Sequence, residues 1–203
     1  MSRNGIVIDM ETTGPDPAAD RICSLALIAL ADGRVHPEGQ LYLIFDPGVE
    51  SGAEALAWHG LDDWLLRHQR PFADYAADLR QMLAQAPLVI AHQLSVKLRF
   101  LNAELERAGL EAVAPRGFCT REAAKRRWPG ESPELNDCLA RLGFHRGARK
   151  HGAAEDCALT SALYLFFQGN MKPDIRYPAN PHNRREPPPA PEPLPPREED
   201  AEA

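Results

Sequence analysis

Short apolar runs mark the first part of the chain. Residues 5–10 and 22–31 are rich in isoleucine, valine and leucine, and residues 40–45 alternate less cleanly between apolar and polar positions. Runs of this length and composition are typical of β-strands. Residues 88–91 form a further run, which we interpret as a buried fourth strand. The pattern therefore predicts a sheet that begins the fold and takes in one later strand.

A helical period replaces the strand pattern elsewhere. Four leucines recur at intervals of 4, 3 and 4 residues and form one stripe of a helix; they are Leu94, Leu98, Leu101 and Leu105. The sequence predicts helices over residues 53–58, 62–68, 72–84, 96–108, 120–127, 133–142 and 153–167. Strands followed by helices around one more strand indicate a mixed α/β domain.

The last 33 residues differ in composition from the rest. They hold 10 of the 19 prolines and end in an acidic stretch. Such a segment cannot bury enough apolar surface to offset its conformational entropy. We therefore predict a domain over residues 1–170 and a disordered, proline-rich acidic tail over residues 171–203. Its removal is expected to leave the melting temperature nearly unchanged. The Pro-x-x-Pro spacing leaves open that the tail binds a protein partner.

The bulk composition narrows the class of protein. A chain of 203 residues with 44% hydrophobic residues is long enough for one well-filled core. It contains no apolar run long enough to cross a bilayer and no signal-peptide pattern at its start, so a cytoplasmic protein without a membrane partner is expected. Its four cysteines are dispersed and lack the spacing of a zinc site, which predicts reduced thiols.

Positive charge gathers in one part of an otherwise acidic chain. Residues 1–115 carry 9 Lys/Arg and 16 Asp/Glu, a net charge of −7, whereas residues 116–150 carry 9 and 4, a net charge of +5. A basic stretch of this kind can bind phosphates of a nucleic acid, although a solvated helix face is the plainer alternative. The predicted phosphate contacts are Arg121, Lys125, Arg126, Arg149 and Lys150, with Arg127 and Arg146 beside them.

Two groups of polar residues carry the candidate chemistry. Asp9 and Glu11 are two residues apart at the end of the first strand, so both project to one side. Two carboxylates this close call for a cation, and their oxygens suit Mg²⁺ or Mn²⁺. His151 and Asp156 cannot share a helix face, so His151 must lie in the preceding loop to reach the same site and act as a base. Taken alone, either group could be plain surface charge.

In their order along the chain, these groups resemble motifs of the DEDDh 3′→5′ exonuclease family. The first is Ile8-Asp9-Met10-Glu11-Thr12-Thr13-Gly14 and the third is His151-x-Ala153-x-x-Asp156. Ala57-Trp58-His59-Gly60-Leu61 is similar to the family's Val-His-Gly-Ile segment, and His92, Phe100 and Leu101 match its second motif. The resemblance covers roughly residues 5–168, and within the family it is nearest to the proofreading epsilon subunit of bacterial DNA polymerase III.

The resemblance implies a ribonuclease H-like fold with a mixed five-stranded sheet flanked by helices. It also implies two divalent metal ions and hydrolysis of terminal phosphodiesters at single-stranded DNA or RNA 3′ ends, with a DNA polymerase as one conceivable partner. Asp9, Glu11 and Asp156 would be metal ligands, with His151 as general base. The expected nucleotide contacts are Thr12, Thr13, Gly14, His59, His92 and Val96.

The second motif departs from the family. Lys97 stands where the family has its second aspartate, and Val96 replaces an aromatic residue that packs beside the terminal nucleotide. Glu104 is seven residues further on, about 10 Å along the helix, and does not restore the missing acid. Lys97 shares a helix face with leucines, so its ammonium is expected to reach Asp9, although a solvated side chain is the alternative.

Charge counting turns this departure into a hypothesis. Four carboxylates balance two Mg²⁺ ions, whereas three carboxylates and the Lys97 ammonium balance one. We therefore predict a single divalent ion, with Lys97 in place of the second. The favoured function is a 3′→5′ exonuclease that uses metal-activated water. The alternative is a catalytically impaired pseudo-exonuclease that binds nucleic acid or serves as a polymerase-associated subunit.

Overall fold

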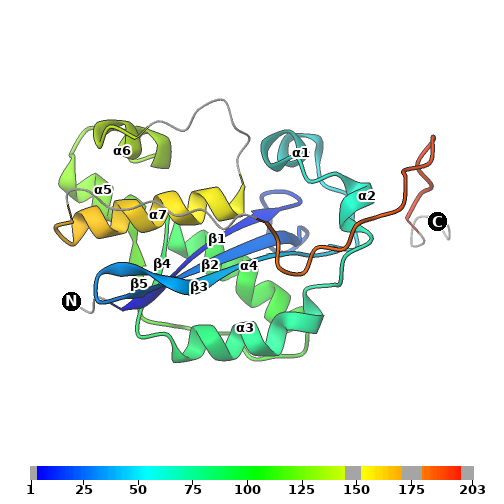
Figure 1. Cartoon of the computed structure of the whole chain (residues 1–203), viewed down its shortest axis with the longest axis horizontal. Coiled ribbons are helices and arrows are strands. Elements are labelled where there is room, and N and C mark those ends of the chain that lie inside the picture. Colours follow the sequence, from blue (N-terminus) through cyan, green and yellow to red (C-terminus); the bar gives the residue numbers. More distant parts are fainter. Residues whose placement is uncertain (1–3, 145–151, 171–179, 198–203) are drawn as a thin grey trace.

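A computed structural model describes residues 4–144, 152–170 and 180–197. Five strands and seven helices are arranged in three layers, with the sheet in the middle (Figure 1). The strands are β1 (Gly5–Thr12), β2 (Ile22–Ala31), β3 (Arg34–Ile44), β4 (Val89–Ala91) and β5 (Gly117–Cys119). The helices are α1 (Ala53–His59), α2 (Asp63–Leu66), α3 (Ala73–Gln85), α4 (Leu94–Arg107), α5 (Thr120–Arg127), α6 (Leu135–Arg141) and α7 (Ala153–Phe167).

The sheet is mixed, in the order β3-β2-β1-β4-β5. The pairs β1/β2 and β2/β3 are antiparallel, and β1/β4 and β4/β5 are parallel. Asp32 and Gly33, both with positive φ, form the tight turn between β2 and β3, as the twist of a two-residue hairpin requires. The expected mixed five-stranded sheet flanked by helices is therefore confirmed.

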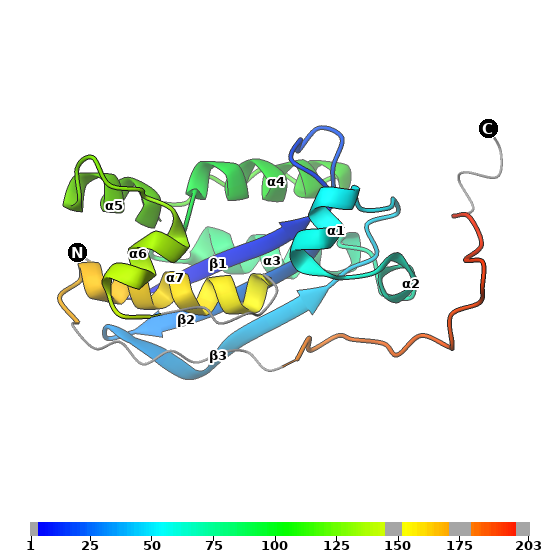
Figure 2. The same cartoon turned by 90° about the horizontal axis from the view of Figure 1, so that it is seen from above.

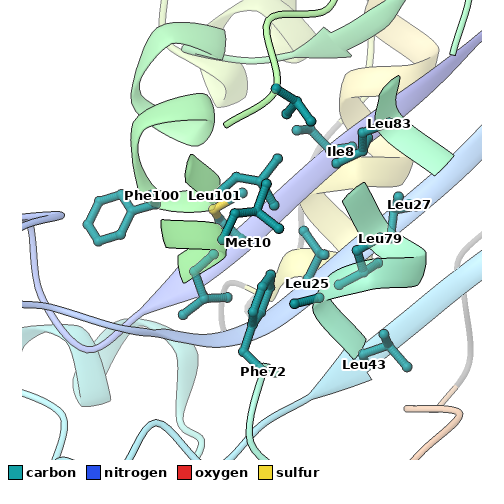
Figure 3. Packing of buried hydrophobic residues seen from close by; sticks show 14 of the residues in the cluster. Ile8, Met10, Leu25, Leu27, Leu43, Phe72, Leu79, Leu83, Phe100 and Leu101 are labelled. Atoms are coloured by element: carbon teal, nitrogen blue, oxygen red, sulfur yellow. The ribbon is translucent and has the colours of Figure 1, made fainter. Parts of the chain in front are cut away.

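Alternate residues of β1 pack into two hydrophobic cores, one on each face of the sheet. Ile8 and Met10 pack with α3 and α4 on one face of the sheet (Figure 3), and Val7 packs with α7 on the other. Since side chains alternate along a strand, Asp9 and Glu11 belong to the Val7 face. The strand thereby directs both carboxylates toward the helix that carries Asp156.

The main differences from the sequence prediction concern β5, β3 and α4. β5 is a fifth strand that the apolar pattern did not locate, and β3 begins at Arg34 rather than at residue 40. The added part of β3 is largely exposed and contains Pro37, which an edge strand tolerates. α4 begins at Leu94, behind Gln93 in the left-handed conformation. Among the described residues, no helix is long and apolar enough to cross a membrane.

The described part of the tail has no regular structure, but it contacts the domain. Residues 180–197 form no helix or strand, as a proline-rich segment should, but they run along β3 and α2 and form hydrogen bonds and ion pairs with them (Figure 2). Composition predicts the lack of regular structure. It does not predict the contacts of individual side chains, such as the ion pair of Arg197 with Asp46. Residues 171–179 and 198–203 lie outside the described part of the chain.

Candidate active site

Three carboxylates meet at the junction of β1 and α7. Asp9 is buried in β1, Glu11 lies two residues further on, and Asp156 occupies the first turn of α7. Each offers an oxygen, and the three oxygens lie within 4.8 Å of one another. An all-oxygen set of this size suits a hard cation such as Mg²⁺ or Mn²⁺.

Lys97 enters this cluster from α4. Its Nζ lies 2.7 Å from Asp9 Oδ1 and donates a hydrogen bond of 3.0 Å to the Met10 carbonyl. The side chain thus has the inward orientation favoured by the helical stripe. Lys97 lies in the first turn of α4, where the helix dipole disfavours a cation. The charged contact with a buried carboxylate offsets that cost.

The two charges modify each other. Burial raises the pKa of Asp9 to about 6; the Lys97 ammonium opposes this shift, and the neighbouring Asp156 adds to it. Burial disfavours the ammonium of Lys97, but the attraction of Asp9, Glu11 and Asp156 outweighs it, and the pKa of Lys97 is raised. Lys97 is therefore cationic at neutral pH and holds Asp9 in its charged form.

Two cavities flank the cluster. One of about 380 Å³ contains Asp9, Lys97 and Asp156 in its wall, and another of about 470 Å³ adjoins Glu11 and the turn that follows β1. Trp58, whose side chain is largely exposed, lines both. The acidic cluster is therefore accessible from two hollows of the size that a nucleotide needs.

A family model described as Exonuclease, of the RNase T type, matches residues 6–164. The chain belongs to this exonuclease family. Members of the family are nucleases, which hydrolyse their substrates, and the match includes residues of all five strands and all three carboxylates. The sequence-based recognition of the family is confirmed.

Individual relatives are distant. The chain is 27% identical over 162 residues to the 3′-5′ exonuclease DinG of Bacillus subtilis and 26% identical over 168 residues to a PolC-type DNA polymerase III of Thermotoga petrophila, covering 79% and 82% of this chain. It spans only 17% and 12% of those two proteins. Ribonuclease T of Haemophilus influenzae is 26% identical over 183 residues, which cover 82% of this chain and 80% of that enzyme.

Solved structures share the fold. Exonuclease X in complex with 5′ overhanging duplex DNA has a TM-score of 0.63 at 20% identity and matches 81% of this chain and 90% of its own. The complex of E. coli exonuclease I with single-stranded DNA has a TM-score of 0.70 at 18% identity and matches 83% and 41%. The predicted ribonuclease H-like exonuclease fold is thus confirmed.

His92 lies at the wall of the first cavity. Its Nδ1 is 3.0 Å from the Thr120 hydroxyl, and its buried Nε2 has no hydrogen-bond partner among the described residues. Burial, with a smaller contribution from Arg121, lowers the pKa of His92 to about 4. The ring is therefore neutral at pH 7.

The residues expected to contact a nucleotide near β1 are largely engaged within the protein. The Thr13 hydroxyl donates to Asp20 (3.1 Å) and accepts from the Arg21 amide (3.0 Å). A Cβ at Gly14 would lie 2.5 Å from the Asp20 carboxylate, so this turn requires glycine for its own packing. The Thr12 hydroxyl donates to the Gly14 carbonyl. These residues still line the second cavity.

His59 and Val96 lie on opposite sides of the cluster. His59 is buried; its Nδ1 accepts from the Leu61 amide at 3.0 Å, and its Nε2 lies 3.8 Å from Cys23 Sγ. It lines the second cavity, whereas Val96 lines the first beside Lys97. Both positions therefore adjoin a hollow, as the resemblance implies.

The basic residues divide into two groups. Arg121 pairs with Glu134 at 2.7 Å, and Lys125 pairs with Glu122 at 2.7 Å, so part of their charge is balanced locally. Arg126 forms no ion pair with any residue of the described ranges. The general base expected from the sequence, His151, lies outside the described residues, as do Arg149 and Lys150.

One wall of the site was missed by sequence reasoning. Glu134, at the N-cap of α6, and the first residues of that helix, Leu135 and Asn136, line the first cavity opposite Trp58 and Lys97. No motif in the sequence marks them, because they reach the site only through the packing of α6 on α7. Glu104 is absent from the cluster, as expected; its carboxylate binds Arg21.

Proposed function

We propose that this protein is a 3′→5′ exonuclease that hydrolyses the terminal phosphodiester of single-stranded DNA or RNA. The observation that carries the proposal is the cluster of Asp9, Glu11 and Asp156 at the wall of an open cavity in a chain of the exonuclease family. The relatives and neighbours named as exonucleases, and the neighbour in complex with single-stranded DNA, support the reaction and the substrate class.

The donor set fits one divalent ion. Three carboxylates and one ammonium leave a net charge of −2, which a single Mg²⁺ or Mn²⁺ balances. Asp9, Glu11 and Asp156 would hold this ion, which when bound lowers the pKa of a water molecule and polarises the phosphate. The tight pairing of Lys97 with Asp9 supports a single ion, because the ammonium already occupies one Asp9 oxygen.

The chain's own residues supply the other requirements of the reaction. Lys97 keeps Asp9 ionised and places a positive charge beside the phosphate, where negative charge develops. His92, neutral at pH 7, lines the same cavity. His151, which precedes α7 in the sequence, is proposed as the base that accepts a proton from the attacking water.

A pseudo-exonuclease is the second candidate. The observation that favours it is the 2.7 Å ion pair between Lys97 and Asp9, which removes the position of a second ion and with it the usual stabilisation of the leaving 3′ oxygen. Binding of nucleic acid would then persist while hydrolysis is slow or absent. A DNA polymerase is a conceivable partner of such a subunit, in view of the similarity to PolC-type polymerase III.

A single assay separates the two functions. The purified chain is incubated with a 3′-labelled single-stranded oligonucleotide, of DNA or RNA, in Mg²⁺ or Mn²⁺, beside the variant Glu11→Ala. Metal-dependent release of mononucleotides that the variant lacks selects the exonuclease. Tight binding without release selects the pseudo-exonuclease, and absence of both contradicts the proposal that this site acts on nucleic acid.

A further inference from the structure

The outer edge of the sheet carries a second, unrelated set of contacts. β3 is an edge strand, so the outward amides and carbonyls of alternate residues have no neighbouring strand. His182 donates its amide to the Tyr42 carbonyl at 2.7 Å and accepts the Tyr42 amide on Nδ1 at 3.0 Å. Asn183 bonds both main-chain groups of Ile44 with its side-chain amide, at 2.7 and 3.0 Å. Two residues of the tail thus satisfy two successive outward positions of the edge.

A buried amide continues this line of contacts. Gln69 is 6% exposed, and its Oε1 accepts from the Arg185 amide at 2.8 Å while its Nε2 donates to the Arg185 carbonyl at 2.9 Å. Nε2 also donates to the Leu65 carbonyl. Buried amides need hydrogen-bond partners. Gln69 makes three side-chain hydrogen bonds, and two of them are with the tail. Its buried amide is therefore satisfied mainly by the tail.

The proline run is bound through its carbonyls. Trp64 Nε1 donates to the Pro188 carbonyl at 2.7 Å, and Arg67 Nη1 donates to the Pro195 carbonyl at 2.8 Å. Prolines carry no N–H, and an extended proline-rich backbone forms no internal hydrogen bonds, so such carbonyls are open to outside donors. The prolines from 188 to 196 remain exposed, so these donors and not ring packing hold the segment.

An arginine ends the contact surface. The Arg197 side chain is only 9% exposed, and its guanidinium lies 2.7 Å from Asp46 Oδ1 and 2.7 Å, through Nε, from Asp63 Oδ1. Asp63 also pairs with Arg67, which donates to the proline run. Hydrogen bonds between charged groups are stronger than neutral ones. Asp46 and Asp63 therefore favour a positive charge at a fixed distance from the proline carbonyls.

We propose that the β3 edge, Gln69 and α2 form a binding site for an extended, proline-rich peptide with an arginine behind its prolines, and that its ligand is residues 182–197 of the same chain. Asparagine at one end and arginine at the other set the register, and the proline carbonyls between them fix the path. The bound segment covers the exposed edge of the sheet at Tyr42 and Ile44 and links α2 to that edge. It is independent of the carboxylate cluster and of the proposed hydrolysis.

The experiment cleaves the chain before the tail and tests whether the cleaved tail stays bound to the domain. A site for a specific protease is introduced within residues 171–179 of the full chain, the folded protein is cleaved, and a dilution series measures how strongly the fragment that carries residues 182–197 is retained. We expect the native fragment to co-elute with the domain. Arg197→Ala and Asn183→Ala are each expected to weaken retention by about tenfold, since each removes hydrogen bonds worth about 1.4 kcal/mol or more. Both changes lie in the tail, so the folding of the domain is not at risk.

Arg184→Ala is the matched control. Arg184 is exposed and pairs with Glu186 inside the tail, so its loss should change retention by less than about twofold. Release of the native fragment as complete as that of Arg197→Ala overturns the proposal, and so does retention that Arg197→Ala leaves unchanged. If the uncut chain elutes as a dimer that Arg197→Ala converts to a monomer, the ligand is the tail of a second copy and the assignment within one chain is overturned.

Discussion

The helix α4 carries two buried acid–base pairs, seven residues apart, that differ in nearly every respect. At its start, Lys97 binds Asp9 beside a cavity. Near its end, Glu104, 2% exposed, binds Arg21 in bidentate fashion at 2.8 and 3.0 Å and also accepts the Ile22 amide at 3.1 Å. Both pairs join α4 to the sheet, and only one of them adjoins other carboxylates.

The difference lies in how far each charge is satisfied. Arg21 donates to both oxygens of the Glu104 carboxylate and the Ile22 amide donates to Oε1, so this buried charge is matched within the protein. Asp9 has one cation and two acidic neighbours, and its pKa is raised to about 6. A fully matched pair serves stability, whereas an over-acidic pair at a cavity is suited to a cation or a phosphate.

The largest effect is expected at the pair that serves stability. Glu104→Gln removes the buried negative charge that binds Arg21 and Arg107, and breaking a buried pair typically costs about 3–5 kcal/mol. Urea unfolding should report that loss, while calorimetry should show divalent metal binding unchanged. The exposed Glu106→Gln on the same helix is the control. A loss below about 1 kcal/mol would mean that the Arg21 pair contributes no more than a surface contact.

Protonation of His92 at acid pH should lower the free energy of unfolding. The folded-state pKa of about 4 is below the ordinary value of 6.5, so the stabilisation from the neutral ring is complete above pH 6.5 and is lost as the pH falls toward 4. Between pH 7 and pH 5 the loss amounts to about 2 kcal/mol. Urea unfolding of the native protein and of His92→Asn at both pH values measures it. An equal loss in both proteins would assign the acid sensitivity to other groups.

Much of the fold could be predicted from the sequence, because its main strands and helices carry their own periodicity. β5 has three residues, too few for any period, and a Cβ at Gly117 would lie 2.3 Å from the end of the Leu94 side chain, a contact between distant segments that the sequence does not mark. The first half of β3 is exposed and contains Pro37, so apolar patterning does not find it. The docking of the tail depends on single residues such as Asn183, which composition does not reveal.

The site could be predicted only in part. The two-residue spacing of Asp9 and Glu11 and the helical stripe that includes Lys97 are local signals, and the structure brings these side chains together. Pairs that join distant segments leave no such signal: Arg21 and Glu104 are 83 residues apart. The wall formed by α6 is set by helix packing alone. The catalytic roles of Asp9, Glu11 and Lys97 remain predictions.

Exchange of the cation at the over-acidic pair should change the chemistry of the site. Lys97→Asp restores a fourth carboxylate and a charge of −4, so we expect calorimetry to detect two divalent ions instead of one. Activity on a 3′-labelled oligonucleotide should rise at least about tenfold, or about 1.4 kcal/mol in the barrier. Val96→Phe added to it should help further by packing the terminal nucleotide, although the effects of adjacent residues need not add.

Arg99→Asp is the matched control for Lys97→Asp. Arg99 is exposed on the same helix, so the variant makes the same change of charge outside the cluster and should alter neither metal stoichiometry nor activity. Two ions bound by the native protein would contradict the single-ion hypothesis. Fast native hydrolysis that Lys97→Asp fails to improve would mean that another group supplies the missing ligand.

The smallest effect concerns matched and unmatched charges on α5. Arg126 forms no ion pair with a described residue, whereas Lys125 is paired with Glu122 at 2.7 Å. If phosphates contact this surface, Arg126→Gln should reduce the salt slope of single-strand binding by about 0.7, the value for one phosphate contact. Lys125→Gln should reduce it less, because Glu122 already balances part of that charge. Fluorescence anisotropy with a labelled oligonucleotide at several salt concentrations measures both slopes. Two unchanged slopes would assign these residues to a solvated helix face, and equal reductions would mean that the Glu122 pair opens when nucleic acid binds.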